Sequence, residues 1–145
     1  MKSYLAQLKS HFRRHREGDA LKDAGAILVA DADRECLAAS CEVLRSGGYE
    51  PIPVSDGAEA LGVYSRNSRR IGVVLTDVSL PTLSGLNLVK VIRRLRPRAR
   101  VMVAAANWVE SKFAEWREIG VTSFVPKPCA AGDLLAGLRR LLVQP

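Results

Sequence analysis

The sequence predicts an α/β domain in which five parallel strands form a sheet covered by helices on both faces. Short β-branched and apolar segments recur along the chain from Ala26 onward, and patterns with apolar residues at i, i+3 and i+4 lie between them. Each predicted strand is followed by a helix, so consecutive strands run parallel, because a parallel connection needs a crossover of this kind.

Five segments are predicted to be strands from their apolar and β-branched content. They cover residues 26–30, 50–54, 71–76, 100–105 and 122–125. The third and fourth contain continuous apolar runs over residues 71–75 and 101–105. Such runs are typical of strands buried on both faces, so these two segments are expected at the centre of the sheet.

Helices are predicted where apolar residues recur at helical spacing. These residues are Leu37, Cys41 and Leu44; Leu83, Leu86, Val89 and Ile92; Phe113, Trp116 and Ile119; and Leu134, Leu135, Leu138, Leu141 and Leu142. Asp33 and Asp56 are expected to act as N-caps. The residues expected at helix ends are Gly47, Gly48, Gly120 and Pro97.

Composition and the amino-terminal sequence favour a globular cytoplasmic protein. The chain is 48% apolar and 26% charged, which excludes a disordered or fibrous protein. Its longest apolar run, residues 101–106, is far shorter than the roughly 20 residues of a membrane-spanning helix, and no signal peptide is present. The spacing of Cys36, Cys41 and Cys129 suggests neither a disulfide framework nor a zinc site.

The positive charge is concentrated before the predicted domain. Residues 1–22 hold six Lys/Arg and two acids, against sixteen and thirteen in residues 23–145. Residues 1–25 are therefore interpreted as a basic amphipathic helical leader and residues 26–145 as the domain. Packing of the leader on its own domain or homodimerisation is the preferred interpretation, while contact with an anionic membrane surface or another partner stays open.

A second basic segment lies near the end of the third predicted helix, with five arginines in residues 93–100. It lacks interleaved aromatic residues and any helix-turn-helix or zinc-finger pattern. A solvated basic face, or a docking surface for an acidic partner, is therefore favoured over a nucleic-acid site. Trp108 and Trp116 are interpreted as residues of a protein interface or of the core.

Chemistry is expected at the carboxyl edge of the sheet, where ligands bind in open α/β folds. The residues at the strand ends are Asp31 after the first strand, Asp77 after the third, Ala105 and Ala106 at the fourth, and Lys127 and Pro128 after the fifth. Two carboxylates and a lysine from distant parts of the chain are thus predicted to converge.

These residues lie in segments 27–31, 73–81, 84–85 and 120–128, which together resemble a response-regulator receiver domain of the chemotaxis type. The resemblance covers nearly all of residues 26–142. It implies a flavodoxin-like fold with strand order 2-1-3-4-5, and two-component signalling in which a histidine kinase or phosphotransfer protein phosphorylates an aspartate. An output through a protein contact is expected.

The resemblance also implies a role for each residue at the edge. Asp77 corresponds to the phosphoacceptor, Lys127 contacts the phosphoryl group, and Pro128 follows a cis peptide that aims this lysine. Asp31, Asp77 and the main-chain carbonyl of Ser79 correspond to the Mg²⁺ ligands. The carboxylate nucleophile must be ionised, and the metal offsets its repulsion from the phosphoryl group.

Two departures from the family pattern concern the metal and the switch. Ala32 replaces a second acid, so Mg²⁺ is expected to bind weakly; Asp33 is expected to cap a helix rather than substitute for it. Ala105 replaces the hydroxyl residue of the switch, and Phe124, the aromatic switch residue, lacks a phenolic oxygen. A hydrogen bond to a charged acceptor contributes about 1.5–3 kcal/mol, and alanine cannot form it.

The leading hypothesis is therefore a phosphoacceptor receiver domain, a signalling module rather than an enzyme. The alternative is a pseudo-receiver that binds partners without phosphate, which Ala32 and Ala105 favour. A nucleic-acid-binding accessory protein ranks third. A small-molecule enzyme ranks last, because His11 and His15 lie in the leader and neither a nucleophile elbow nor a glycine-rich phosphate loop is present.

Overall fold

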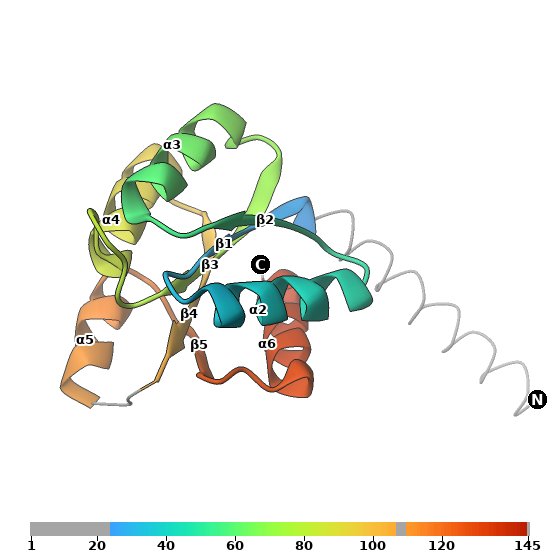
Figure 1. Cartoon of the computed structure of the whole chain (residues 1–145). Coiled ribbons are helices and arrows are strands. Elements are labelled where there is room, and N and C mark those ends of the chain that lie inside the picture. Colours follow the sequence, from blue (N-terminus) through green and yellow to red (C-terminus); the bar gives the residue numbers. More distant parts are fainter. Residues whose placement is uncertain (1–23, 107–109, 145) are drawn as a thin grey trace, which may run out of the picture.

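A computed structural model describes residues 24–106 and 110–144, and its centre is a five-stranded parallel sheet (Figure 1). The strands are β1 (Ala26–Ala30), β2 (Glu50–Val54), β3 (Ile71–Asp77), β4 (Arg100–Ala105) and β5 (Ser123–Pro126). Their order is β2-β1-β3-β4-β5, which confirms the predicted fold. β3 and β5 each extend one residue beyond the predicted end, and β5 begins one residue later than predicted.

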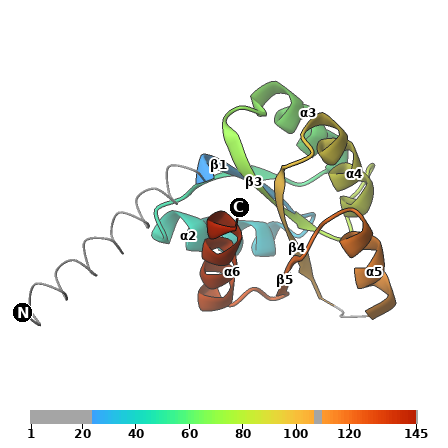
Figure 2. The same ribbon diagram turned by 180° about the vertical axis from the view of Figure 1, so that it is seen from behind.

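Within the described residues, five helices cover the two faces of the sheet. They are α2 (Arg34–Ser46), α3 (Gly57–Asn67), α4 (Gly85–Leu95), α5 (Glu110–Glu118) and α6 (Ala131–Val143). Figure 2 shows α2 and α6 on one side of the sheet and α3, α4 and α5 on the other. The longest of these described helices have 13 residues, and none is long and apolar enough to cross a membrane.

Two apolar cores result, one on each face. Alternate residues of β1 divide between them, with Ile27 and Val29 facing α2 and α6, and Leu28 facing α3 and α4. All five residues of β1 are buried, as expected for a strand covered on both faces. Trp116 of α5 is 3% exposed and belongs to the second core, which confirms core packing for this residue.

The predicted helix caps are confirmed. The Asp33 carboxylate accepts hydrogen bonds from the backbone N–H groups of Glu35 and Cys36, at 3.0 and 3.2 Å. The Asp56 carboxylate accepts one from the N–H of Glu59 at 2.9 Å. The three cysteines are free, as predicted. The predicted leader helix and Trp108 lie outside the described residues, except for positions 24 and 25.

The loop at residues 78–84, which follows β3, is tied to the start of α3. The Thr82 hydroxyl donates to the Asp56 carboxylate at 2.8 Å and accepts from the N–H of Ala58 at 3.1 Å. Gly57 approaches this loop so closely that a Cβ atom would lie 1.9 Å from the carbonyl oxygen of Leu83. The loop that follows Asp77 is therefore held in place by the start of α3.

We expect Gly57→Ala to lower the free energy of unfolding by about 1–3 kcal/mol, because the added methyl group meets backbone that cannot move without repacking. Gly132 in α6 has no atom within 4 Å of the position of an added Cβ. Gly132→Ala is the matched control and should raise the free energy of unfolding by about 0.4–1 kcal/mol. Urea denaturation measures both, and equal stability of Gly57→Ala and the wild type would contradict the close approach.

Candidate functional site

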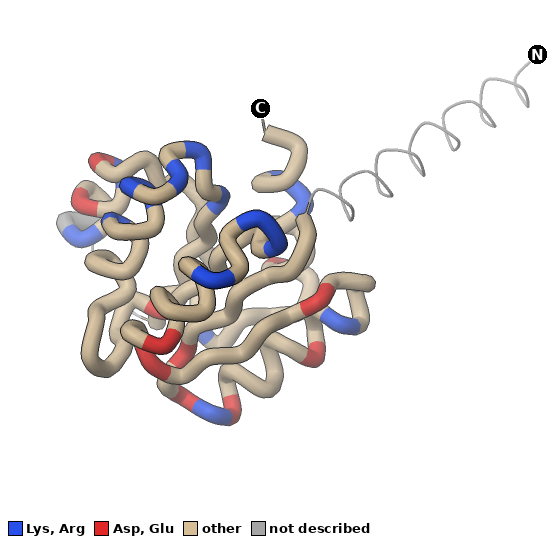
Figure 3. The backbone as a smooth tube through the Cα atoms, turned by 90° about the horizontal axis from the view of Figure 1, so that it is seen from above, with Lys and Arg blue, Asp and Glu red and all other residues tan. Residues whose placement is uncertain are grey.

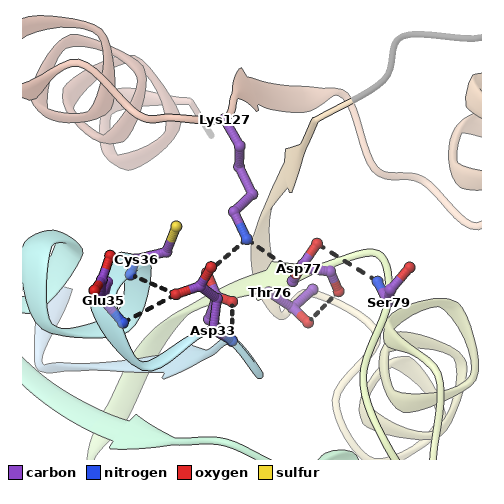
Figure 4. A network of polar contacts seen from close by, with 8 residues as sticks. Asp33, Glu35, Cys36, Thr76, Asp77, Ser79 and Lys127 are labelled. Carbon is purple, nitrogen blue, oxygen red and sulfur yellow. Dashed lines mark hydrogen bonds and ion pairs between the residues drawn. The ribbon is translucent and has the colours of Figure 1, made fainter.

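The carboxyl ends of three strands bring together the lysine and two carboxylates predicted from the sequence; Figure 4 shows Lys127 reaching Asp77. The ammonium of Lys127, after β5, lies 2.8 Å from Oδ2 of Asp31, at the end of β1, and 3.0 Å from Oδ2 of Asp77, at the end of β3. All three side chains are largely buried, at 12%, 8% and 17% exposure. The predicted convergence is therefore confirmed.

The lysine is held in its charged form by its two partners. Burial alone would lower the pKa of Lys127, but the hydrogen bonds and charges of Asp31 and Asp77 outweigh it and raise this pKa above its ordinary value of 10.5. The stabilisation that follows is fully present below pH 10.5 and is lost only as the pH rises further. Two carboxylates against one ammonium leave one negative charge without a partner among these side chains.

The two carboxylates differ in how many of their oxygens have a close hydrogen-bond or ion-pair partner. Both oxygens of Asp31 are engaged, because Oδ1 accepts the N–H of Asp33 at 2.9 Å while Oδ2 faces Lys127. Oδ1 of Asp77 has only a long contact of 3.5 Å with the N–H of Ser79. Asp77 also has the more exposed side chain, so it is the carboxylate better placed to react with an incoming group.

Lys127 is positioned by its own backbone, through its N–H group and the peptide bond that follows it. Its N–H donates to the carbonyl of Ala105 at 3.0 Å, which ties the end of β5 to the end of β4. The bond between Lys127 and Pro128 is cis, as the sequence predicted. From the end of β5 the lysine side chain extends across the edge of the sheet towards β1 and β3 (Figure 4).

The acidic side chains suit a hard cation with few protein ligands. Among the described residues no group of three or more His, Cys, Asp or Glu side chains could hold a metal. Ala32 contributes only a methyl group, and Asp33 is committed to its cap, where the N–H groups of Cys36 and Glu35 hold the pKa of its carboxyl below the ordinary value. Asp31 and Asp77 are two oxygen donors that suit Mg²⁺, which commonly retains several waters.

A cavity of about 310 Å³ opens beside Asp77, between β4 and α5. Its lining includes Ala105 and Ala106, whose small side chains leave this space, and the indole of Trp116 closes part of it. The alanine pair is the signal of this cavity in the sequence, where Ala105 alone predicts a lost hydroxyl rather than a space.

The aromatic residue predicted as part of a switch packs against a partner that sequence reasoning missed. The rings of Phe124 in β5 and Phe113 in α5 lie 4.7 Å apart at 85°, an edge-to-face contact. Phe113 also lines the cavity beside Asp77. A shift of α5 relative to β5 would therefore change the surroundings of both the aromatic pair and the Asp77 edge.

Other parts of the site were also missed by sequence reasoning. Thr82 is a non-glycine residue with φ of 66°, and its hydroxyl joins the loop after β3 to the cap of α3. Gly85 lies where a Cβ would come within 2.1 Å of the carbonyl oxygen of Asp77. The pairing of Thr82 with Asp56 spans 26 positions, so no local pattern signals it.

Comparison with known proteins agrees with this geometry. The family description "response regulator receiver domain" matches residues 27–139. A response regulator receiver protein of Anaeromyxobacter sp. is 34% identical over 108 residues, 74% of this chain and 44% of that protein. Response regulator MprA of Mycobacterium leprae is 31% identical over 116 residues, 80% of this chain and 50% of that protein. The chain thus spans about half the length of these curated relatives.

Solved structures give the same result. Chemotaxis protein CheY4 of Vibrio cholerae superposes with a TM-score of 0.75 at 25% identity, covering 81% of this chain and 98% of that one. A receiver domain protein of Clostridium thermocellum gives a TM-score of 0.76 at 25% identity, with 81% and 94% covered. With its fold, its matched segment and its edge residues in agreement, the chain belongs to the response regulator receiver domain family.

Proposed function

We propose that this chain accepts a phosphoryl group on Asp77 from a histidine kinase or phosphotransfer protein and transmits the signal through a protein contact. The bridge from Lys127 to Asp31 and Asp77 is the observation that carries the proposal. Residues 26–145 would form the receiver and residues 1–25 a separate leader. A cytoplasmic location and a signalling rather than enzymatic role accompany this proposal.

The proposed transfer uses Oδ1, the oxygen of Asp77 that does not face Lys127. Lys127 holds Oδ2, which leaves Oδ1 to attack phosphorus in line with the donor imidazole. The new bond joins Oδ1 to phosphorus, the phosphorus–nitrogen bond breaks, and its electron pair remains on the imidazole. Lys127 would then neutralise a phosphoryl oxygen, since its ammonium already lies 3.0 Å from the acceptor carboxylate.

The proposal includes a weakly bound Mg²⁺. Asp31, Asp77 and the main-chain carbonyl of Ser79 would hold it, and it would offset the negative charge shared by the carboxylates and the phosphoryl group. The methyl group of Ala32 offers no further oxygen. The negative charge that Lys127 leaves without a partner supports a second cation at this site.

Phosphorylation at Asp77 is tested by intact mass measurement after incubation with Mg²⁺ and a small acyl phosphate donor. We expect the wild type to gain the mass of one phosphoryl group and Asp77→Asn to gain none, because an amide is not a nucleophile here. Asp33→Asn is the matched control, since asparagine caps a helix as well as aspartate, and it should still be phosphorylated. An unchanged wild-type mass at saturating Mg²⁺ would leave the pseudo-receiver as the better description.

We expect Lys127→Met to lower the free energy of unfolding at pH 7 by roughly 3 kcal/mol, because two largely buried carboxylates lose their shared cation. Denaturation with and without Mg²⁺ measures this, and Mg²⁺ should stabilise the variant more than the wild type.

Arg70→Met is the matched control for this substitution. It breaks the ion pair of Arg70 with Glu50, whose side chains are 62% and 59% exposed. Such exposed pairs contribute about 0–1 kcal/mol, so this variant should lose little stability and should respond to Mg²⁺ as the wild type does. Equal effects of the two substitutions would refute the special role of Lys127.

We expect Ala105→Thr to strengthen binding of beryllofluoride, a phosphoryl mimic, by about tenfold or more in the presence of Mg²⁺. A hydroxyl there supplies one hydrogen bond to a charged acceptor, which contributes about 1.5–3 kcal/mol. The adjoining cavity has room for the added atoms. Calorimetric titration checks the result, with Ala106→Thr, the exposed neighbour on the same cavity, as the control that should not gain affinity.

A further inference from the structure

The amino end of the sheet, opposite the Asp77 site, carries a group of exposed or half-exposed arginines. They come from the ends of α3 and α4, the turns that follow them and the start of β4. This arginine pole consists of Arg66, Arg69, Arg94, Arg96, Arg98 and Arg100. Figure 3 shows several basic stretches near the end of the domain from which both termini leave.

The segment of the chain that carries the arginine pole holds few acidic residues. From residue 60 to residue 100 the sequence contains nine Lys/Arg and one acid, Asp77, which lies at the opposite edge of the sheet. None of the six arginines forms an ion pair within the part of the chain that the structure describes, whereas nearby Arg70 pairs with Glu50. The pole is therefore free to bind a polyanion.

Arginine alone makes up this pole, without lysine. Its planar guanidinium presents a fork of N–H donors that matches the oxygens of a phosphate group. Arg93, which precedes Arg94 in the last turn of α4, has a partner within the domain instead, because its guanidinium donates to the carbonyl of Gly120 at 3.2 Å. The arginines of the pole lack such partners, so phosphate groups of an external ligand suit them.

Exposed aliphatic side chains lie at the same end. Leu95, at the end of α4 between Arg94 and Arg96, is 55% exposed, and Val143, at the end of α6, is 68% exposed. These are the large hydrophobic side chains that are exposed among the described residues. A basic surface with protruding aliphatic groups suits the boundary between lipid headgroups and acyl chains.

The sequence beyond this end adds positive charge. Residues 1–22 carry six Lys/Arg and two acids, and they join the domain beside Gly25, which pairs with Ile71 at the amino end of β3. The attachment point of this basic segment is therefore on the same side of the domain as the arginine pole. This position adds to the attraction between that end and a negatively charged surface.

We infer that the arginine pole is a docking surface for an anionic phospholipid membrane. A nucleic-acid backbone offers the same phosphate groups, but it has no acyl chains that the aliphatic side chains of Leu95 and Val143 could contact. Single-stranded nucleic acid also favours exposed aromatic side chains for stacking, and the described residues with side-chain data include none that is exposed. In the docked orientation the Asp77 edge faces away from the lipid and stays accessible to a phosphodonor.

The test is sedimentation of the full chain with vesicles of phosphatidylcholine, with or without 30 mol% phosphatidylglycerol, a fraction of roughly one anionic lipid in three chosen to give a strong surface potential. We expect binding only to the anionic vesicles, and release as salt is raised. Arg96→Gln with Arg98→Gln should weaken binding roughly 25-fold, because each basic residue near the surface contributes about fivefold. Leu95→Ser should weaken it further.

The matched control is Arg34→Gln with Lys90→Gln, which removes the same charge from exposed positions outside the pole. We expect this control to retain most of the affinity of the wild type. Equal losses in the two double variants would overturn the inference, as would equal binding to vesicles without anionic lipid. Full binding by the pole variant would assign the contact to residues 1–22, and salt-sensitive binding to duplex DNA without vesicle binding would assign it to nucleic acid; both outcomes reject the proposal.

Discussion

The contact of one ammonium with two carboxylates is the interaction on which the carboxyl edge depends. The ends of three different strands supply Asp31, Asp77 and Lys127. The ammonium of the lysine lies within 3.0 Å of an oxygen of each carboxylate. Without the lysine, the carboxylates would repel each other in a largely buried place. The sheet order puts β1 beside β3, which fixes the two acids as neighbours, while β5 is two strands from β3 and the long lysine side chain closes the remaining distance.

The surrounding structure keeps this edge in register. The N–H of Lys127 donates to Ala105 at the end of β4, and the loop after Asp77 is held by Thr82 on the cap of α3. Close approaches of Gly57 and Gly85 leave this loop little freedom. The Asp77 carboxylate is thus positioned by contacts from several elements, while its own Oδ1 keeps only the long contact of 3.5 Å with the N–H of Ser79. Rigid support around a nearly free oxygen suits the role proposed for Asp77.

The sequence predicted the features that local chemistry determines. Strand content, helical spacing and capping residues such as Asp33 each report on a few neighbouring positions, and the order of strand ends predicted the meeting of Asp31, Asp77 and Lys127. Contacts between distant side chains were not predictable in this way. The edge-to-face pair of Phe113 with Phe124 depends on the packing of α5 against β5, and the cavity depends on what surrounds Ala105.

The two ends of the domain carry charges of opposite sign, and the common direction of the helices explains this arrangement. Each described helix that follows a strand runs back from the carboxyl edge, so helix starts, with the capping acids Asp33 and Asp56, gather around Asp77. Helix ends, where positive charge is favoured by the helix dipole, gather at the other end with Arg66 and Arg94. Substitutions at the arginine pole therefore leave the Asp77 edge undisturbed, since the length of the strands separates the two groups of charges.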